Sequence, residues 1–165
     1  MRSVEAMLYK LTALTVSSLL LAACGGQPSG SAAPAAPAAA PAAALPRSAA
    51  PADAKVYIIS PANGATVASP FKVEFGLSGM GVAPAGVQFE NTGHHHLLVD
   101  VDLPEDMSVP LANDATHLHF GKGQTETTVT LPPGTHTLQL VLGDSLHIPF
   151  DPPVISDKIT VTVAP

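Results

Sequence analysis

Residues 93–102, GHHHLLVDVD, decide the fold class because their apolar side chains recur with a period of two. Leu97, Val99 and Val101 fall on one face of a strand, and the residues between them fall on the other face. The same period recurs on both sides of this stretch, in residues 56–59, 71–77, 117–120, 127–131, 138–142 and 159–163. Turns rich in Gly, Pro and Asn separate these segments, and none has the 3.6-residue repeat of an amphipathic helix. The sequence therefore predicts an all-β domain.

About seven short strands with frequent turns, in about 110 residues, predict an immunoglobulin-like antiparallel β-sandwich. Residues 131–140, LPPGTHTLQL, resemble the Pro-Gly-x-Tyr-x-Leu entry into a late strand of many bacterial immunoglobulin-like modules. In those modules the aromatic residue sits at a corner and its polar tip binds backbone. The resemblance implies that His136 is an architectural corner residue, and metal ligation is the alternative.

The hydrophobic residues, 46% of the chain, are spread over three segments that differ in composition. Residues 25–53 contain 13 Ala and six Pro, and Leu45 is their only larger apolar side chain. Such a segment cannot bury enough surface to offset the entropy of ordering it, and its repeated prolines oppose a helix. We predict a signal peptide at residues 1–23, a disordered Ala/Pro-rich tether at residues 24–53 and one folded domain at residues 54–165.

The leader ends at the chain's single cysteine, Cys24. Arg2 and Lys10 precede an apolar run over residues 11–23, which is short for a membrane span. The run ends in LAAC at residues 21–24, which resembles the lipobox of bacterial lipoproteins. The resemblance implies acylation of Cys24 and stable membrane anchoring by several acyl chains, with a non-lipidated secreted protein as the alternative. Gly25 and Gly26, rather than Asp, follow the cysteine, and the resemblance to Gram-negative sorting patterns implies the outer membrane, with the domain facing the periplasm.

Charge and motifs exclude several classes of function. The predicted domain has four lysines and eleven carboxylates, which leaves a net charge of −7 with histidine neutral. Nucleic acid is therefore not an expected partner, because phosphate binding needs clustered Lys and Arg. The nucleophile-elbow, Walker A, dinucleotide-binding and His-Glu-x-x-His motifs are absent from the sequence, so we predict a protein that is not an enzyme.

All seven histidines lie between His94 and His147. Strand alternation places His94 and His96 on the polar face opposite Leu97, and it places His117 and His119 outward on their own strand. Residues two apart on a strand lie about 6.5–7 Å apart, so pairing of the two strands could bring up to four imidazoles together. Imidazole nitrogens suit copper and zinc.

We predict a transition-metal site that starts from His94, His96 and His119. The further candidate ligands are His117, His95 and His147, and Asp100 or Glu90 could complete the shell or orient a ring. Imidazole nitrogens more than about 8 Å apart could not share an ion, because metal–nitrogen bonds are about 2.0–2.1 Å long. The alternatives are histidines that organise loops through hydrogen bonds, or histidines with a pH-dependent or ligand-binding role.

The predicted function is a lipid-anchored cell-envelope protein that captures, buffers or delivers copper or zinc. Its expected partners are the membrane, through Cys24, and a metal-delivery protein. The alternative is a non-catalytic envelope module that binds a protein or glycan through its loops, carries structural histidines and needs no cofactor.

Several ordered phrases of the sequence carry a family resemblance. They are residues 57–67 YIISPANGATV, 71–81, 91–98 NTGHHHLL, 119–127 HFGKGQTET and 142–149 LGDSLHIP. Together they resemble a bacterial exported family catalogued as domain of unknown function 4399, from about Val56 to Val163. The resemblance implies no activity, but it places His94–His96, His119 and His147 inside the family-defining phrases.

Overall fold

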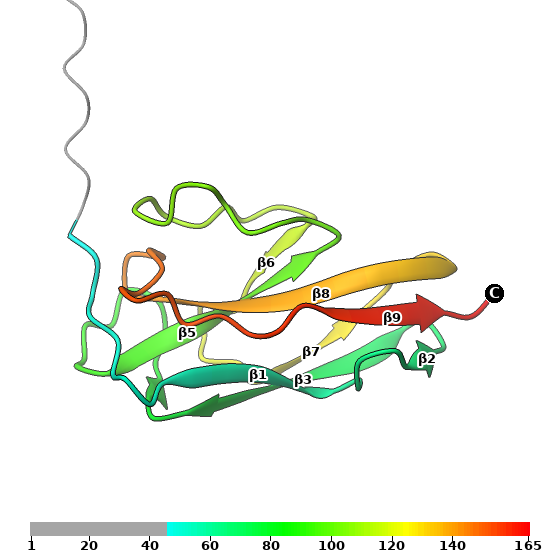
Figure 1. Ribbon diagram of the computed structural model, residues 1–165, viewed down its shortest axis with the longest axis horizontal. Coiled ribbons are helices and arrows are strands. Elements are labelled where there is room, and N and C mark those ends of the chain that lie inside the picture. Colours follow the sequence, from blue (N-terminus) through cyan, green and yellow to red (C-terminus); the bar gives the residue numbers. More distant parts are fainter. Residues whose placement is uncertain (1–45) are drawn as a thin grey trace, which may run out of the picture. The chain divides into compact units, whose positions relative to one another are not determined.

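The computed structural model describes residues 46–165, which form an all-β domain of nine strands (Figure 1). The predicted signal peptide and Cys24 lie outside the described residues, as does the tether up to Leu45. Within residues 46–165, no helix is long and apolar enough to cross a membrane.

Two sheets form the sandwich. The smaller sheet has the order β1-β3-β7, made of β1 (Lys55–Ser60), β3 (Phe71–Ser78) and β7 (Glu126–Val129). The larger sheet has the order β2-β9-β8-β5-β4, made of β2 (Thr66–Val67), β9 (Ile159–Val163), β8 (Gly134–Gly143), β5 (Thr92–Val99) and β4 (Gly81–Val82). The short strand β6 (His117–His119) also pairs with β5.

The two-residue period predicted the longer strands correctly. Strands β2 and β4 are additional, and each forms a two-residue parallel pairing, whereas the other strand pairs are antiparallel. Strand β5 ends at Val99, two residues before the predicted end at Val101. The reason is Asp100, whose φ of 58° lies in the left-handed region and breaks the extended backbone.

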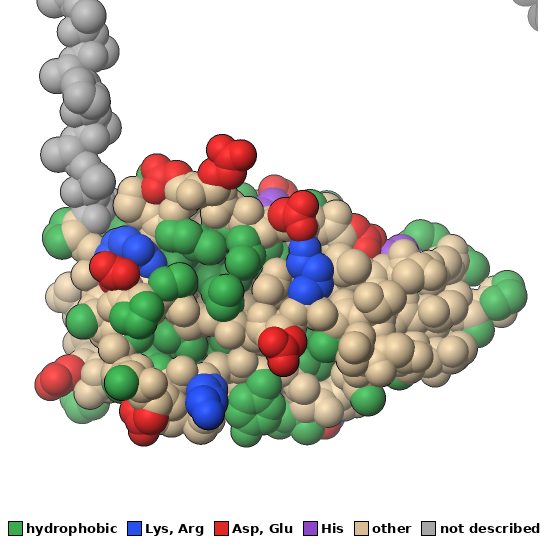
Figure 2. All heavy atoms as spheres, viewed as in Figure 1, with side chains coloured by type: hydrophobic (Ala, Val, Ile, Leu, Met, Phe, Trp, Pro, Cys, Tyr) green, Lys and Arg blue, Asp and Glu red, His purple; other side chains and the backbone are tan. Residues whose placement is uncertain are grey.

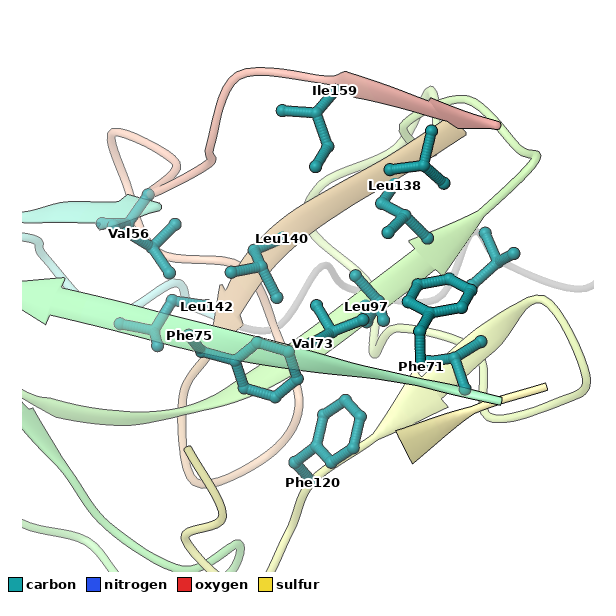
Figure 3. Close-up of a cluster of buried hydrophobic side chains, with 14 of the residues drawn as sticks. Val56, Phe71, Val73, Phe75, Leu97, Phe120, Leu138, Leu140, Leu142 and Ile159 are labelled. Atoms are coloured by element: carbon teal, nitrogen blue, oxygen red, sulfur yellow. The ribbon is translucent and has the colours of Figure 1, made fainter. Parts of the chain in front are cut away.

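Apolar side chains from both sheets meet between them (Figure 3). Val73 on β3 and Leu97 on β5 are fully buried, as are Leu138, Leu140 and Leu142 on β8. Figure 3 shows Phe71, Phe75 and Phe120 beside them. Burying each such side chain contributes about 1.5–3 kcal/mol to folding, so this layer dominates the stability of the sandwich.

A second apolar cluster covers the outer face of the larger sheet. Leu98 on β5 and Val141 on β8 pack with Leu111, and the half-buried Val101 and Leu103 flank them. The loop that joins β5 to β6 supplies these covering side chains, and it passes over β5 and β8 in Figure 1. The face predicted to be polar and outward is therefore covered rather than open.

Candidate metal centre

Strand register places histidines from β5 and β6 on the covered outer face of the larger sheet. His96 on β5 pairs with His119 on β6, and His94, two residues earlier, lies on the same face as His96. On the other side of β5, His94 pairs with Gly143 at the end of β8. Three neighbouring strands thus define a site around these rings.

Four imidazoles converge there, and they belong to His94, His96, His119 and His147. One candidate ligand atom from each lies within 4.8 Å of all the others. Nε2 of His94 is 3.0 Å from Nε2 of His96 and 3.1 Å from Nδ1 of His147. The His119 ring centroid is 5.0 Å from those of His94 and His96 and 4.7 Å from that of His147. We call these four residues the histidine group.

Two glycines leave the space that the rings occupy. A Cβ atom on Gly121 would lie 2.3 Å from Cε1 and 2.5 Å from Nε2 of His119. A Cβ atom on Gly143 would lie 3.0 Å from Nε2 of His96. Each distance is shorter than the ordinary contact of 3.4–4 Å, so an alanine at either position would push a ring of the group out of its place.

His147 reaches the group from the loop that follows β8. Its φ of 67° is in the left-handed region, which a residue with a Cβ adopts only at a cost of about 1–3 kcal/mol when its surroundings hold it there. The backbone N–H of His147 donates to the carbonyl of Asp144 at 2.9 Å, and the His147 carbonyl accepts from the N–H of Leu111 at 2.8 Å. The fourth imidazole is therefore fixed by backbone contacts rather than by a strand.

Burial favours the uncharged form of His94, His96 and His119. His94 and His96 are each 1% exposed, while His119 and His147 are half-buried. Burial, aided by the neighbouring imidazoles, lowers the pKa of His94 to about 4 and that of His96 to about 2. Burial also lowers the pKa of His119. Neutral imidazoles have free lone pairs, which is the state that binds a metal ion.

Hydrogen bonding within the group is incomplete. Nε2 of His94 faces two other ring nitrogens, yet a neutral imidazole nitrogen carries only one proton or one in-plane lone pair. Nδ1 of His96 and Nε2 of His119 are buried without a hydrogen-bond partner. The protons and lone pairs of the rings thus do not satisfy all the buried nitrogens of the group.

The donor set fits a transition-metal ion. With metal–nitrogen bonds of about 2.0–2.1 Å, adjacent ligand nitrogens lie about 2.9 Å apart at right angles and about 3.3 Å apart in a tetrahedron. The two close contacts, 3.0 and 3.1 Å, fall between these values, and the 4.8 Å limit on the other separations leaves a small closure to be made. The four residues could therefore hold one ion without rearranging the sheet.

The three residues from which the predicted site starts, His94, His96 and His119, all belong to the histidine group. Of the further candidates, His147 also belongs to it. His117 shares their face, but it pairs with Leu98, and its Nδ1 lies 3.0 Å from Oδ1 of Asp114. His95 points to the other face, where its ring centroid is 5.2 Å from that of Phe75. Neither residue belongs to the group.

The two carboxylates considered as further ligands are also outside the group. Glu90 lines a surface pocket with Phe89 and Ser145. Asp100 instead binds the corner residue His136, whose Nδ1 is 2.7 Å from Oδ2 of Asp100 and whose Nε2 is 2.9 Å from the carbonyl of Pro132. His136 thus makes the architectural side-chain-to-backbone contact that its sequence context predicted.

Sequence reasoning missed Asp144, Gly121 and Gly143, which support the group without binding through a ring. The signal for Gly143 and Asp144 was present as the Gly-Asp pair at the end of the strand pattern, directly before the loop of His147. On the face shown in Figure 2, histidine side chains appear only as small purple areas.

The fold and the site define a β-sandwich protein with four converging imidazoles on the covered face of its larger sheet. A family model described as "Domain of unknown function (DUF4399)" matches residues 73–164, which is more than half of the chain. The chain belongs to this family, and all four members of the histidine group lie inside the match. No curated protein and no solved structure matched the chain.

Proposed function

We propose that this protein binds one transition-metal ion through His94, His96, His119 and His147. The observation that carries the proposal is the convergence of four imidazoles, whose ligand atoms lie within 4.8 Å of one another. The buried Nε2 of His119 has no hydrogen-bond partner and supports it, because a buried polar atom that makes no hydrogen bond destabilises a fold by about 1–3 kcal/mol. A bound cation would satisfy the lone pairs together.

Copper is the first choice of metal and zinc the second. The group offers nitrogen alone, and imidazole suits copper, zinc and nickel better than it suits calcium or magnesium. For a given nitrogen site, affinity among divalent ions peaks at Cu(II), which favours copper unless geometry or supply selects zinc. Four protein ligands would leave no open position on a tetrahedral ion, which suits holding an ion for capture, buffering or delivery rather than catalysis.

The proposed place of action is the bacterial cell envelope. Cys24 would carry the lipid anchor, the Ala/Pro-rich segment would space the domain from the outer membrane, and the domain would face the periplasm. A metal-delivery protein is the proposed partner. Metabolic labelling with palmitate tests the anchor, because a Cys24→Ala variant should lose both the label and the membrane fraction. Equal labelling of the variant and the unchanged chain would refute it.

Metal binding is tested by calorimetry on the full chain, purified without an affinity tag and stripped with a chelator. We expect one equivalent of Cu(II) or Zn(II) to bind, and single alanine substitutions of His94, His96, His119 or His147 to weaken binding by at least tenfold. His117→Ala is the matched control, because His117 lies on the same strand face as His119 and outside the group. Unchanged affinity in the four variants would refute the proposal.

A further inference from the structure

Asp144 organises the loop that presents His147. Its carboxylate is 4% exposed. Oδ1 accepts hydrogen bonds from the backbone N–H groups of Leu146 at 2.9 Å and Ile148 at 3.0 Å, on either side of His147. The N–H of Asp144 in turn donates to the carbonyl of Ile148 at 2.9 Å. The loop is therefore closed around this one side chain, which compensates for the left-handed backbone of His147.

The second carboxylate oxygen of Asp144 binds a residue far away in sequence. The hydroxyl of Ser48 donates to Oδ2 of Asp144 at 2.8 Å. Ser48 belongs to residues 47–50, which we call the N-terminal segment. These residues fall within the predicted tether, residues 24–53, and they lie against the residues that follow the His147 loop.

Several contacts hold the N-terminal segment in place. Nε of Arg47 donates to the carbonyl of Pro149 at 3.0 Å, and another guanidinium N–H donates to the carbonyl of Phe150. The guanidinium of Arg47 also lies 3.4 Å from the carboxylate of Asp151. The N–H of Asp151 donates to the carbonyl of Ser48 at 2.8 Å, and the N–H of Ala50 donates back to the carbonyl of Asp151 at 3.1 Å. The segment thus fixes both ends of the stretch from Asp144 to Asp151.

Asp144 also supplies negative charge to the site. Its hydrogen-bond partners are neutral amides and a hydroxyl, so they satisfy its oxygens without cancelling its charge. Its field acts on His94, where it favours a positive charge. A carboxylate in this position is stabilised by a cation in the histidine group, and it stabilises that cation in return.

We infer that Asp144 is a positioning residue for His147, and that Ser48 makes the N-terminal segment part of the metal site. This inference rests on the proposed metal-binding function. Detaching the segment releases Oδ2 of Asp144 and loosens the loop, so the fourth imidazole is held less firmly. The metal site is then coupled to the stretch of chain that leads toward the predicted membrane anchor.

The test measures Zn(II) affinity and the visible spectrum of bound Co(II) in the full chain. Loss of an outer partner of a metal ligand costs about 10–100-fold in affinity, so we expect Asp144→Ala to weaken binding by that factor and to shift the Co(II) spectrum toward that of His147→Ala. Ser48→Ala leaves both Oδ1 contacts intact, and we expect a loss of about fivefold, which corresponds to one hydrogen bond.

Asp100→Ala is the matched control. Asp100 also organises a turn, since its Oδ1 accepts the N–H of Thr137 at 2.8 Å and its Oδ2 binds His136, but it lies outside the histidine group. It should lower stability without changing metal affinity or the Co(II) spectrum. If the Asp144→Ala variant does not fold, Asp144→Asn takes its place, because the asparagine amide oxygen can still accept the N–H groups of Leu146 and Ile148. The expected metal affinity of Asp144→Asn lies between that of the unchanged chain and that of His147→Ala.

Two negative outcomes have different meanings. If the unchanged chain binds no metal, the proposed function fails. If it binds metal and His147→Ala is weakened, but the folded Asp144 and Ser48 variants bind as tightly as the unchanged chain, the positioning role alone is overturned.

Discussion

Gly121→Ala tests the geometry of the histidine group without removing a ligand. The new Cβ would lie 2.3 Å from Cε1 and 2.5 Å from Nε2 of His119, and 3.1 Å from the Cβ of Ala85. Ordinary contacts are 3.4–4 Å, so the imidazole must retreat by about 1 Å. Metal–nitrogen bonds stay within about 0.2 Å of 2.0–2.1 Å, so a ring held about 1 Å from its present place binds a shared ion less tightly.

The expected result is a loss of about 10–100-fold in Zn(II) or Cu(II) affinity, close to that of His119→Ala. Stability of the metal-free protein should change by less than about 1 kcal/mol. Alanine reduces the entropy of the unfolded chain by about 0.4–1 kcal/mol, which offsets part of the cost of moving a half-buried ring. Calorimetry gives the affinity, and urea unfolding with a chelator gives the stability.

Gly81→Ala is the control, because its Cβ would meet only Cγ2 of Thr92, at 3.3 Å. It should leave metal affinity unchanged. The reasoning is wrong if Gly121→Ala binds metal as tightly as the unchanged chain while His119→Ala is weakened.

Three further predictions concern the pH dependence of stability and the roles of His136 and His95. The metal-free protein should lose stability as pH falls below about 6.5, because His94 and His96 stay neutral when folded and bind protons when unfolded. In urea unfolding, the free energy of unfolding should fall by up to about 1.36 kcal/mol per pH unit for each of these two residues. A free energy of unfolding that does not change with pH would contradict this prediction. The contact with Asp100 raises the pKa of His136, so this contact stabilises the fold below about pH 6.5 and weakens as pH rises. The His136→Gln substitution should therefore lower the free energy of unfolding more at pH 5.5 than at pH 8.5. An equal loss at both pH values would show that the contact between His136 and Asp100 does not depend on the charge of His136. The His95→Leu substitution should raise the free energy of unfolding by about 1 kcal/mol, because both ring nitrogens of His95 are buried without a hydrogen-bond partner. It should leave metal affinity unchanged, because His95 lies on the opposite face of β5 from the histidine group. Weaker metal binding would show that the His95 ring contributes to the metal site.

The period of two was sufficient to predict the longer strands and the faces of their side chains. Successive side chains on a strand alternate by geometry, so His94 and His96 had to share a face that His95 could not share. The pairing of β5 with β6 could not be derived, because register between strands depends on contacts distant in sequence. The His96–His119 pair was therefore a hypothesis until the register was known.

The covering of that face could not be predicted either. The loop between β5 and β6 has no periodic pattern, yet it brings Leu111 onto Leu98 and Val141. His147 also lies in a segment without a periodic pattern, so the sequence could name it only as a further candidate metal ligand. Its position depends on a left-handed backbone and on the carboxylate of Asp144, and neither is visible as a repeat or a spacing.

The division between strand-borne and loop-borne ligands bears on how the site could release an ion. His94, His96 and His119 are fixed by the backbone ladders of paired strands, so their rings can separate only if the sheet deforms. His147 depends on a short loop whose hydrogen bonds converge on Asp144, and Asp144 is held in turn by a serine hydroxyl. Opening that loop breaks a few hydrogen bonds, whereas opening the sheet would also expose the apolar layer beneath Leu97. The loop of His147 is therefore a less costly place for the site to open than the sheet, and under the proposed function a partner that accepts the ion would act there.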